Sequence, residues 1–454
     1  MTAIFNRFQK PVSIAPLAMF RVIFGIMVLF STLRFILKGW VHDLYIKPKY
    51  FFTYYGFDWI KPLNETGMYT IFFVMVICAV GIILGYRYKL SALLFFLLFT
   101  YVELIDKTNY LNHYYFVSLV SLLLVLVPAG NYFSLDVKHN RVKALSFTPK
   151  WTIDIFKFQL GIVYFFAGIA KLNYHWLIEA EPLSNWLKHQ TDLPIIGGLM
   201  KHKLTAYVFA WSGAIYDLTI PFILLTKKWR VLGYILVIIF HVLTAIMFPI
   251  GVFPFVMIAS TLIFFSPKFH ENCLSIFAKL IKYKLMPKHK KQPVQSTNHI
   301  VKSFLILYIS LQLLIPFRYT LYKNDLFWTE QGFRFSWRVM LIEKAGYAEF
   351  IIKDKNIGGQ LIIDNSLYLT PQQEKMMSTQ PDMILQFAIY LKHIFKDSIW
   401  QENDQTIQIL DPIVTVNSRV ALFNQGSRPF IDPNINLAAQ KRGWQHKNWI
   451  LPYE

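Results

Sequence analysis

Charged residues and cysteines are scarce in this sequence. Asp, Glu, Lys and Arg make up only 16% of its 454 residues, whereas soluble globular chains carry about a quarter. The two cysteines, Cys78 and Cys273, lie in an apolar run and in a basic loop, so we expect neither a disulfide nor a metal site. The H-E-x-x-H, G-x-S-x-G and P-loop motifs are absent as well, so none of these signatures assigns a chemistry.

Apolar residues are abundant instead. Hydrophobic residues make up 55% of the chain and aromatic residues 17%, which is typical of membrane helices with Trp and Tyr at the interfaces. About nine apolar runs approach the ~20 residues that cross a bilayer. The first follows Arg7 and Lys10 and is too long for the apolar part of a signal peptide. The runs occupy residues 14–37, 69–86, 89–105, 113–128, 151–173, 203–226, 229–247, 251–266 and 299–317.

The positive charge indicates topology. The formal net charge is +20, but most of it lies in short loops between apolar runs, which argues against a nucleic-acid partner. A cytoplasmic N-terminus places residues 87–89, 138–150, 227–230 and 267–298 inside, and nine spans then place 318–454 outside. We therefore expect an integral membrane protein with its N-terminus in the cytoplasm. The lysines of the last loop are Lys268, Lys279, Lys282, Lys284, Lys288, Lys290 and Lys291.

The last third of the chain has a different pattern. Alternating stretches at 349–353, 360–364 and 407–417 predict strands. Thr370 and Pro371 are typical of a helix N-cap and first turn, which predicts a helix near 371–396. The sequence thus predicts a polytopic α-helical membrane protein with two domains. They are a helical domain over 1–317 and an extracytoplasmic, strand-rich α+β domain over 318–454.

One face of the fifth apolar run carries a lysine. Helical spacing places Gly161, Tyr164, Gly168 and Lys171 on this face, where the two glycines would let a neighbouring helix approach closely. Ionisable groups within spans are costly and therefore functional candidates. The alternative is that Lys171 reaches to the interface with its long side chain, and position alone favours that alternative.

Other polar residues lie at the same outer level or deeper. The connection between the third and fourth runs contains Asp106, Lys107 and His113. Its simplest interpretation is a solvated loop with a local Asp106–Lys107 pair. Asp217 and His241 lie well inside their runs, where contacts between helices would explain them as well as a function would.

Four blocks of the sequence, in order along nearly the whole chain, carry a resemblance. They are Asp106-Lys107-Thr108 with Asn112-His113, the run 164–172 with Trp176, Phe240-His241 with 248–251, and 328–338 with 431–433 and 449–452. Together they resemble the vitamin K-dependent γ-carboxylase family, including its bacterial members with a horizontally transferred transmembrane (HTTM) domain.

The resemblance implies a reaction. A lysine deprotonates a reduced naphthoquinone of the vitamin K or menaquinol type, and O2 then oxygenates it. The oxygenated quinone removes a γ-proton from a glutamate of a peptide or protein. CO2 capture then gives γ-carboxyglutamate, and quinone epoxide is the second product. No metal is expected.

The resemblance also implies roles for single residues. Lys171 matches the base, and His113 is a second catalytic candidate. Lys107, His241, Tyr164 and Gly168 are the candidates for quinone binding. Phe333, Ser336 and Trp337 belong to the segment that matches the glutamate-binding region, where animal members carry Tyr in place of Phe333.

Three interpretations of function stay open. The first is a γ-glutamyl carboxylase with quinol epoxidase activity. The second is an enzyme that oxidises quinol without carboxylating protein, and the third is a non-catalytic membrane receptor or transporter on the same scaffold. The Lys171 motif together with His113 favours an enzyme, because a scaffold needs no lysine beside two glycine-bearing turns.

Overall fold

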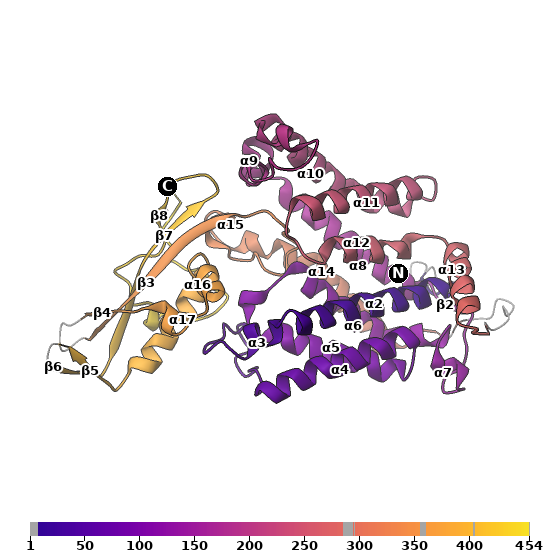
Figure 1. Ribbon diagram of the computed structural model, residues 1–454, viewed down its shortest axis with the longest axis horizontal. Coiled ribbons are helices and arrows are strands. Elements are labelled where there is room, and N and C mark those ends of the chain that lie inside the picture. The colour runs from indigo at the N-terminus through magenta and orange to yellow at the C-terminus, as the bar shows by residue number, and fades with distance from the viewer. Residues whose placement is uncertain (1–7, 285–293, 295, 355–359, 403–404, 454) are drawn as a thin grey trace.

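The computed structural model describes residues 8–284, 294, 296–354, 360–402 and 405–453. It consists of a large helical part and a smaller strand-containing part at one end of it (Figure 1). Helix α13 lies at the opposite end of the helical part (Figure 1). There the strand β1 (Pro11–Ser13) pairs with β2 (Phe147–Pro149), directly before helix α8.

All nine predicted apolar runs contain helix, but two of these helices are short. Within the described residues, seven helices are long and apolar enough to cross a membrane, or eight if the bent pair α12–α13 counts as one span. The polytopic helical class is therefore confirmed. The helices are α2 (Ala15–Leu37), α3 (Trp40–Tyr45), α4 (Glu65–Leu84), α5 (Tyr88–Ile105), α6 (Asn112–Leu126), α7 (Leu135–Lys138), α8 (Trp151–Lys171), α9 (Leu183–Lys188), α10 (Lys203–Leu225), α11 (Arg230–Met247), α12 (Phe253–Thr261), α13 (Pro267–Leu280) and α14 (His299–Leu314), the last continued by a 3₁₀ turn (Ile315–Leu321).

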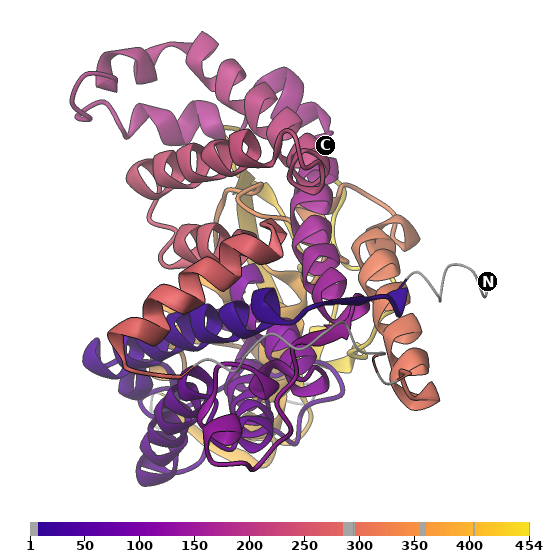
Figure 2. The same ribbon diagram turned by 90° about the vertical axis from the view of Figure 1, so that its right-hand side faces the viewer.

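Prolines account for the two short helices. Pro128 follows the end of α6 by two residues, and a proline cannot continue a helix. After α12, Ser266 caps a new helix whose first residue is Pro267, and the axis bends by 114°. Seen from the N-terminal end, α13 lies across the other helices (Figure 2). The predicted loop 267–298 therefore contains a helix, and Lys288, Lys290 and Lys291 lie outside the described residues.

The helical part is apolar both inside and outside. Its core includes Phe20, Phe24, Phe95 and Phe156, which are buried between the helices. Large apolar side chains are also exposed on the outer faces of the helices, among them Leu204, Val208, Phe222, Val231 and Ile239. Apolar side chains on both sides of a helix are typical of a protein whose solvent is lipid.

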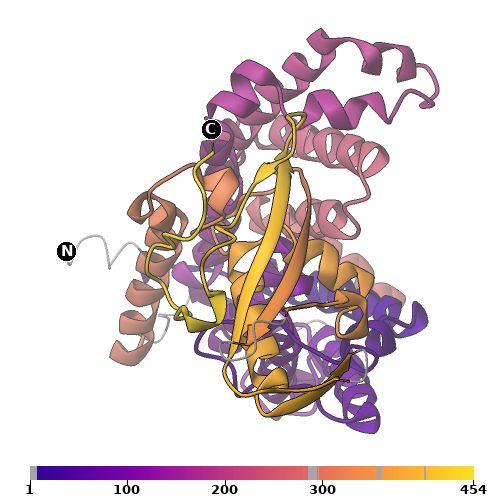
Figure 3. The same ribbon diagram turned by 90° about the vertical axis from the view of Figure 1, so that its left-hand side faces the viewer.

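A four-stranded antiparallel sheet in the order β4-β3-β7-β8 forms the strand-containing part. Its two long strands run side by side over eleven residues, from the pair Lys344–Leu422 to the pair Asp354–Pro412 (Figure 3). Phe387 of α17 packs against Phe350 of β3. The elements are β3 (Lys344–Asp354), β4 (Gln360–Ile362), β5 (Ser398–Glu402), β6 (Gln405–Ile409), β7 (Pro412–Leu422), β8 (Arg428–Pro429), α15 (Leu326–Thr329), α16 (Pro371–Met377) and α17 (Pro381–Phe395).

The predicted strands and helix of this part are present, but two of these predicted elements are each split in two. The stretch 407–417 contains the end of β6 and the first half of β7. The helix predicted near 371–396 is two helices, because Pro381 begins a second one after the extended residue Gln380. Thr370 caps the first helix as predicted, in a reciprocal capping box with Gln373.

Candidate active site

Lys171 is the last residue of α8 and is buried, with 6% of its surface exposed. Its Nζ donates to Oδ2 of Asp217 on α10 at 2.7 Å and to the Ala167 carbonyl at 3.3 Å. Asp217 is 4% exposed. The alternative in which Lys171 extends to the interface is therefore wrong, because its ammonium group is turned inward and paired with a carboxylate.

Gly168 allows this pairing. A Cβ at position 168 would lie 2.7 Å from Cγ and 2.8 Å from the backbone nitrogen of Leu218, the residue next to Asp217. Only glycine permits so close an approach of α8 and α10. At Gly161 the nearest atom, in Pro221, would be 3.8 Å away, which is ordinary contact. Of the two predicted glycines, only Gly168 is required for the packing.

Trp176 covers the outer side of the ion pair. It lies in the π-helical turn His175–Glu179 that follows α8. Its Nε1 donates to the Ala210 carbonyl of α10 at 2.8 Å, and the Lys171 Nζ is 5.3 Å from its ring centroid. The indole thus fixes the end of α8 against α10 and leaves an aromatic face beside the ammonium group.

A second polar contact lies deeper on the same face of α8. The Tyr164 hydroxyl is 3.1 Å from Nε2 of His241 on α11. His241 is buried, and its Nδ1 has no hydrogen-bond partner among the described residues. Asp217 and His241 therefore each contact α8, and they do so through different residues of that helix.

His113 borders this group from another helix. Its ring centroid, at the start of α6, is 5.8 Å from that of Phe253, and the His241 ring is 5.9 Å from the same phenylalanine. Within the described residues, the polar contacts of Lys171 do not include His113. The two histidines thus approach one aromatic ring, whereas Lys171 lies nearer the end of the bundle.

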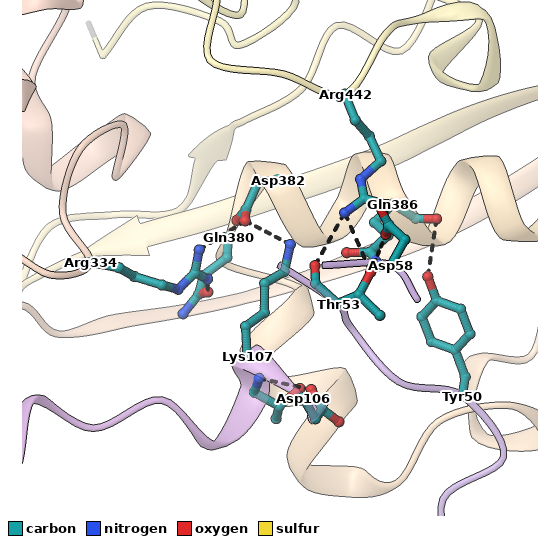
Figure 4. Close-up of polar contacts among 11 residues, drawn as sticks. Tyr50, Thr53, Asp58, Asp106, Lys107, Arg334, Gln380, Asp382, Gln386 and Arg442 are labelled. Carbon is teal, nitrogen blue, oxygen red and sulfur yellow. Dashed lines mark hydrogen bonds and ion pairs between the residues drawn. The ribbon is translucent and has the colours of Figure 1, made fainter. Parts of the chain in front are cut away.

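Lys107 lies elsewhere, at the junction of the two parts. It is 4% exposed, and its Nζ contacts Oδ2 of Asp382 on α17 at 2.8 Å (Figure 4). Arg334 contacts the same oxygen at 2.8 Å. The predicted Asp106–Lys107 pair is wrong. Asp106 accepts instead from the Thr108 backbone and from Gln373 of α16, both at 2.8 Å.

Burial and charge act in opposite directions on this network. Burial lowers the pKa of Lys107 to about 8, although the Asp382 carboxylate opposes the shift. Burial would raise the pKa of Asp382, but the charges of Arg334 and Lys107 outweigh it and hold that pKa well below its usual value. Asp382 is therefore a carboxylate that joins the two parts.

The predicted glutamate-binding segment enters the helical part. Trp337 is 1% exposed and stacks on Tyr115 of α6 with ring centroids 4.9 Å apart. Phe333 is half-buried, and the Ser336 hydroxyl donates to the Gly332 carbonyl at 3.2 Å. Positive φ values at Phe335 (63°) and Trp337 (59°) strain the backbone, and such strain persists where the surrounding structure imposes it.

Comparison with known families covers both parts of the chain. Residues 9–269 match the HTTM domain. Residues 297–454 match the lumenal domain of the vitamin K-dependent gamma-carboxylases. The chain belongs to the vitamin K-dependent γ-carboxylase family. No solved structure matched the chain.

Polar and aromatic groups meet between α8, α11 and α12. His241 has a buried ring nitrogen with no hydrogen-bond partner among the described residues. Phe253 and the stacked pair Phe240–Tyr216 supply apolar ring surface beside it. Lys171 lies about two helical turns from Tyr164 along α8.

The structure therefore divides the predicted site residues into two groups. Tyr164, Gly168, Lys171 and His241 lie along the α8 face, with His113 at its border. Lys107, Phe333, Ser336 and Trp337 lie at the junction with the lumenal-type domain. The sequence pointed to Asp217 as a carboxylate inside an apolar run without assigning it a role, and it did not single out Arg334 or Asp382. A carboxylate within a span was the available signal for Asp217.

Proposed function

We propose that this chain is a membrane γ-glutamyl carboxylase that couples the oxidation of a reduced naphthoquinone to the carboxylation of glutamate. The observation that carries the proposal is Lys171, a buried lysine paired with Asp217 beside an aromatic face in a member of this family. A buried lysine that can lose its charge is the form of lysine that serves as a base.

The residues have distinct roles in the proposal. Lys171 takes the proton of the quinol hydroxyl. Tyr164 and His241 orient the ring, and His113 lines the same aromatic surroundings. The reaction of the reduced quinone with O2 supplies the free energy that ionises the γ C–H bond. Acid–base catalysis by a side chain would not suffice, since it contributes only ~10²–10⁴ in rate. CO2 is then captured by the glutamate carbanion.

We place the lumenal-type domain outside a bacterial inner membrane and the N-terminus in the cytoplasm. The basic loops, with Lys138, Arg141, Lys143 and Lys150, lie on the N-terminal side of α8, whereas Lys171 lies at its other end. The positive-inside rule supports this orientation. An apolar quinone would then enter from the bilayer and a Glu-containing peptide from the aqueous side.

The structure also carries an observation that favours the second function, quinol oxidation without carboxylation. Trp337 of the predicted glutamate segment is buried against Tyr115 in the helical part. A peptide can contact its ring only if the segment moves. A protein in which it does not move would oxidise quinol and leave peptides unmodified.

The test supplies purified protein in lipid nanodiscs with reduced naphthoquinone, O2, labelled bicarbonate and Glu-containing peptides. We expect acid-stable label in the peptide and quinone epoxide as the second product, both lost in Lys171→Ala. Lys150→Ala is the matched control, because Lys150 is the N-cap residue of the same helix and pairs with Asp154. Epoxide without labelled peptide would support the second function. If neither product forms, only the receptor or transporter interpretation is left.

A further inference from the structure

The pair Lys171–Asp217 is almost completely withdrawn from solvent. Both residues are buried, and their side chains meet at 2.7 Å. The close contact of Gly168 with Leu218 encloses one side of the pair, and Trp176 with its hydrogen bond to Ala210 encloses another. Removing two charges from water is expensive, so such a pair stays ionised only while its own attraction compensates the lost hydration.

This pair poses a chemical difficulty for a base. A lysine takes up a proton only in its neutral form, whereas an ion pair with a carboxylate favours the ammonium form. In apolar surroundings the ionised and the neutral pair come closer in free energy, because only the ionised pair loses hydration of charges. The hydrogen bond from Nζ to Oδ2 already provides the path for that proton.

We infer that Asp217 stores the proton that Lys171 must release before it can act as a base, an inference that rests on the proposed function. When an apolar ring covers the pair, one N–H bond of Lys171 breaks and one O–H bond forms on Asp217. The neutral amine then takes the proton of the quinol hydroxyl, which leaves a quinol anion beside the new ammonium group. No electron is transferred in either step, and Asp217 acts through Lys171 without touching the quinol.

The neighbouring titratable groups are compatible with this role. Tyr164 of α8 and Tyr216 of α10 lie close enough to interact electrostatically with Asp217. Within the part of the chain that the structure describes, His241 of α11 contacts Tyr164 and makes no hydrogen bond to Lys171 or Asp217. Among the described residues, none of these groups hydrogen-bonds to Lys171 or Asp217, so the proton of the pair is shared by these two residues.

A shared proton makes a specific prediction about pH. Two coupled groups that hold one proton between them keep that proton over a wide pH range. Wild-type quinol oxidation should therefore change little across neutral pH. In Asp217→Asn the lysine must give its proton to water, so the rate should fall about tenfold for each pH unit below the new titration point. Asp217→Glu should restore the flat profile.

The experiment measures epoxide formation against pH in nanodiscs for wild type, Asp217→Asn and Asp217→Glu. Asp154→Asn is the matched control, because it removes an ion pair from the other end of the same helix. A rate that falls by one common factor at every pH in Asp217→Asn would show a merely structural role and overturn the inference. Absence of epoxide from wild type would instead overturn the proposed function, and the inference with it.

Infrared spectroscopy provides a readout that needs no turnover. Oxidised naphthoquinone serves as the apolar probe, and the protein carries ¹³C-labelled aspartate. We expect the carbonyl band of a protonated, buried carboxyl group to appear when the probe binds to wild type, with the isotope shift of aspartate. If the probe binds and this band does not appear, the inference is overturned, even where Asp217→Asn does not fold.

Discussion

Two ion clusters in this molecule differ in their charge balance. In the helical part, one lysine faces one carboxylate, Lys171 and Asp217, so the pair has no net charge. At the junction with the lumenal-type domain, Asp382 faces both Lys107 and Arg334. Moving one proton leaves the first cluster without any charge. The second would keep a charged guanidinium, because arginine does not release its proton.

This difference in charge balance distinguishes a pair that can transfer a proton from a cluster that only stabilises the structure. A cluster that one proton can neutralise is able to change state when its surroundings become apolar. The Asp382 cluster cannot, so its carboxylate stays ionised and holds together segments that are far apart in the sequence. Asp382 is also 36% exposed on its side chain, whereas Asp217 is buried. Variants of the two clusters should therefore affect different measurements.

The largest effect is expected on activity, from Lys171→Ala. Loss of the base should lower quinol epoxidation by about 10²–10⁴-fold, the usual contribution of a positioned acid–base group. Lys107→Ala should instead act mainly through stability, since Lys107 joins the two parts of the protein. Epoxide assays on both variants check this contrast, and equal loss of activity per folded protein would contradict it.

The next effect is on stability, from Asp382→Ala. This change leaves the charges of Lys107 and Arg334 without their common carboxylate. We expect a loss of about 3 kcal/mol, at the lower end for a broken buried pair because Asp382 is partly exposed. Thermal unfolding in detergent measures it. Asp411→Ala, which removes an exposed partner of Lys392, is the control and should cost less than about 0.5 kcal/mol.

Gly168→Ala should have a somewhat smaller effect on stability and a clear effect on activity. The added methyl group would collide with Leu218, so we expect about 2 kcal/mol of destabilisation and a displaced Asp217. Gly161→Ala adds the same group on the same helix, at a position where the nearest atom would be 3.8 Å from the new Cβ. It should leave both unfolding and epoxidation near wild type. Similar behaviour of the two variants would mean that the close contact does not position the pair.

The last effect is the pH dependence of stability that Lys107 contributes. Burial lowers the pKa of Lys107 to about 8 in the folded protein, whereas the ordinary pKa of a lysine is 10.5. The unfolded chain thus binds more protons between pH 8 and 10.5, so the free energy of unfolding should rise with pH over this window. A shift of this size corresponds to a rise of about 3 kcal/mol over the window, measured as the difference between wild type and Lys107→Met. A difference that does not grow across this window would contradict the lowered pKa.

Much of the fold follows from local patterns. The apolar runs predicted the helices, and Thr370 with Pro371 predicted the start of α16, because both signals depend on residues a few positions apart. The patterns failed at Pro381, which divides the predicted helix 371–396, and at Pro267, where a helix begins in a predicted loop. The family blocks also identified Lys171, but they indicated nothing about its partner.

The sequence by itself determined that the chain has apolar helices, a strand-containing C-terminal domain and a lysine at the end of α8. Only the tertiary structure decided what that lysine faces. Asp217 is 46 residues away from Lys171, and Asp382 is 275 residues away from Lys107. Such pairings depend on how helices pack, here on the contact at Gly168, and packing leaves no local period in the sequence. Because of this packing Lys171 is buried and paired, although its position in the sequence favoured an interfacial side chain.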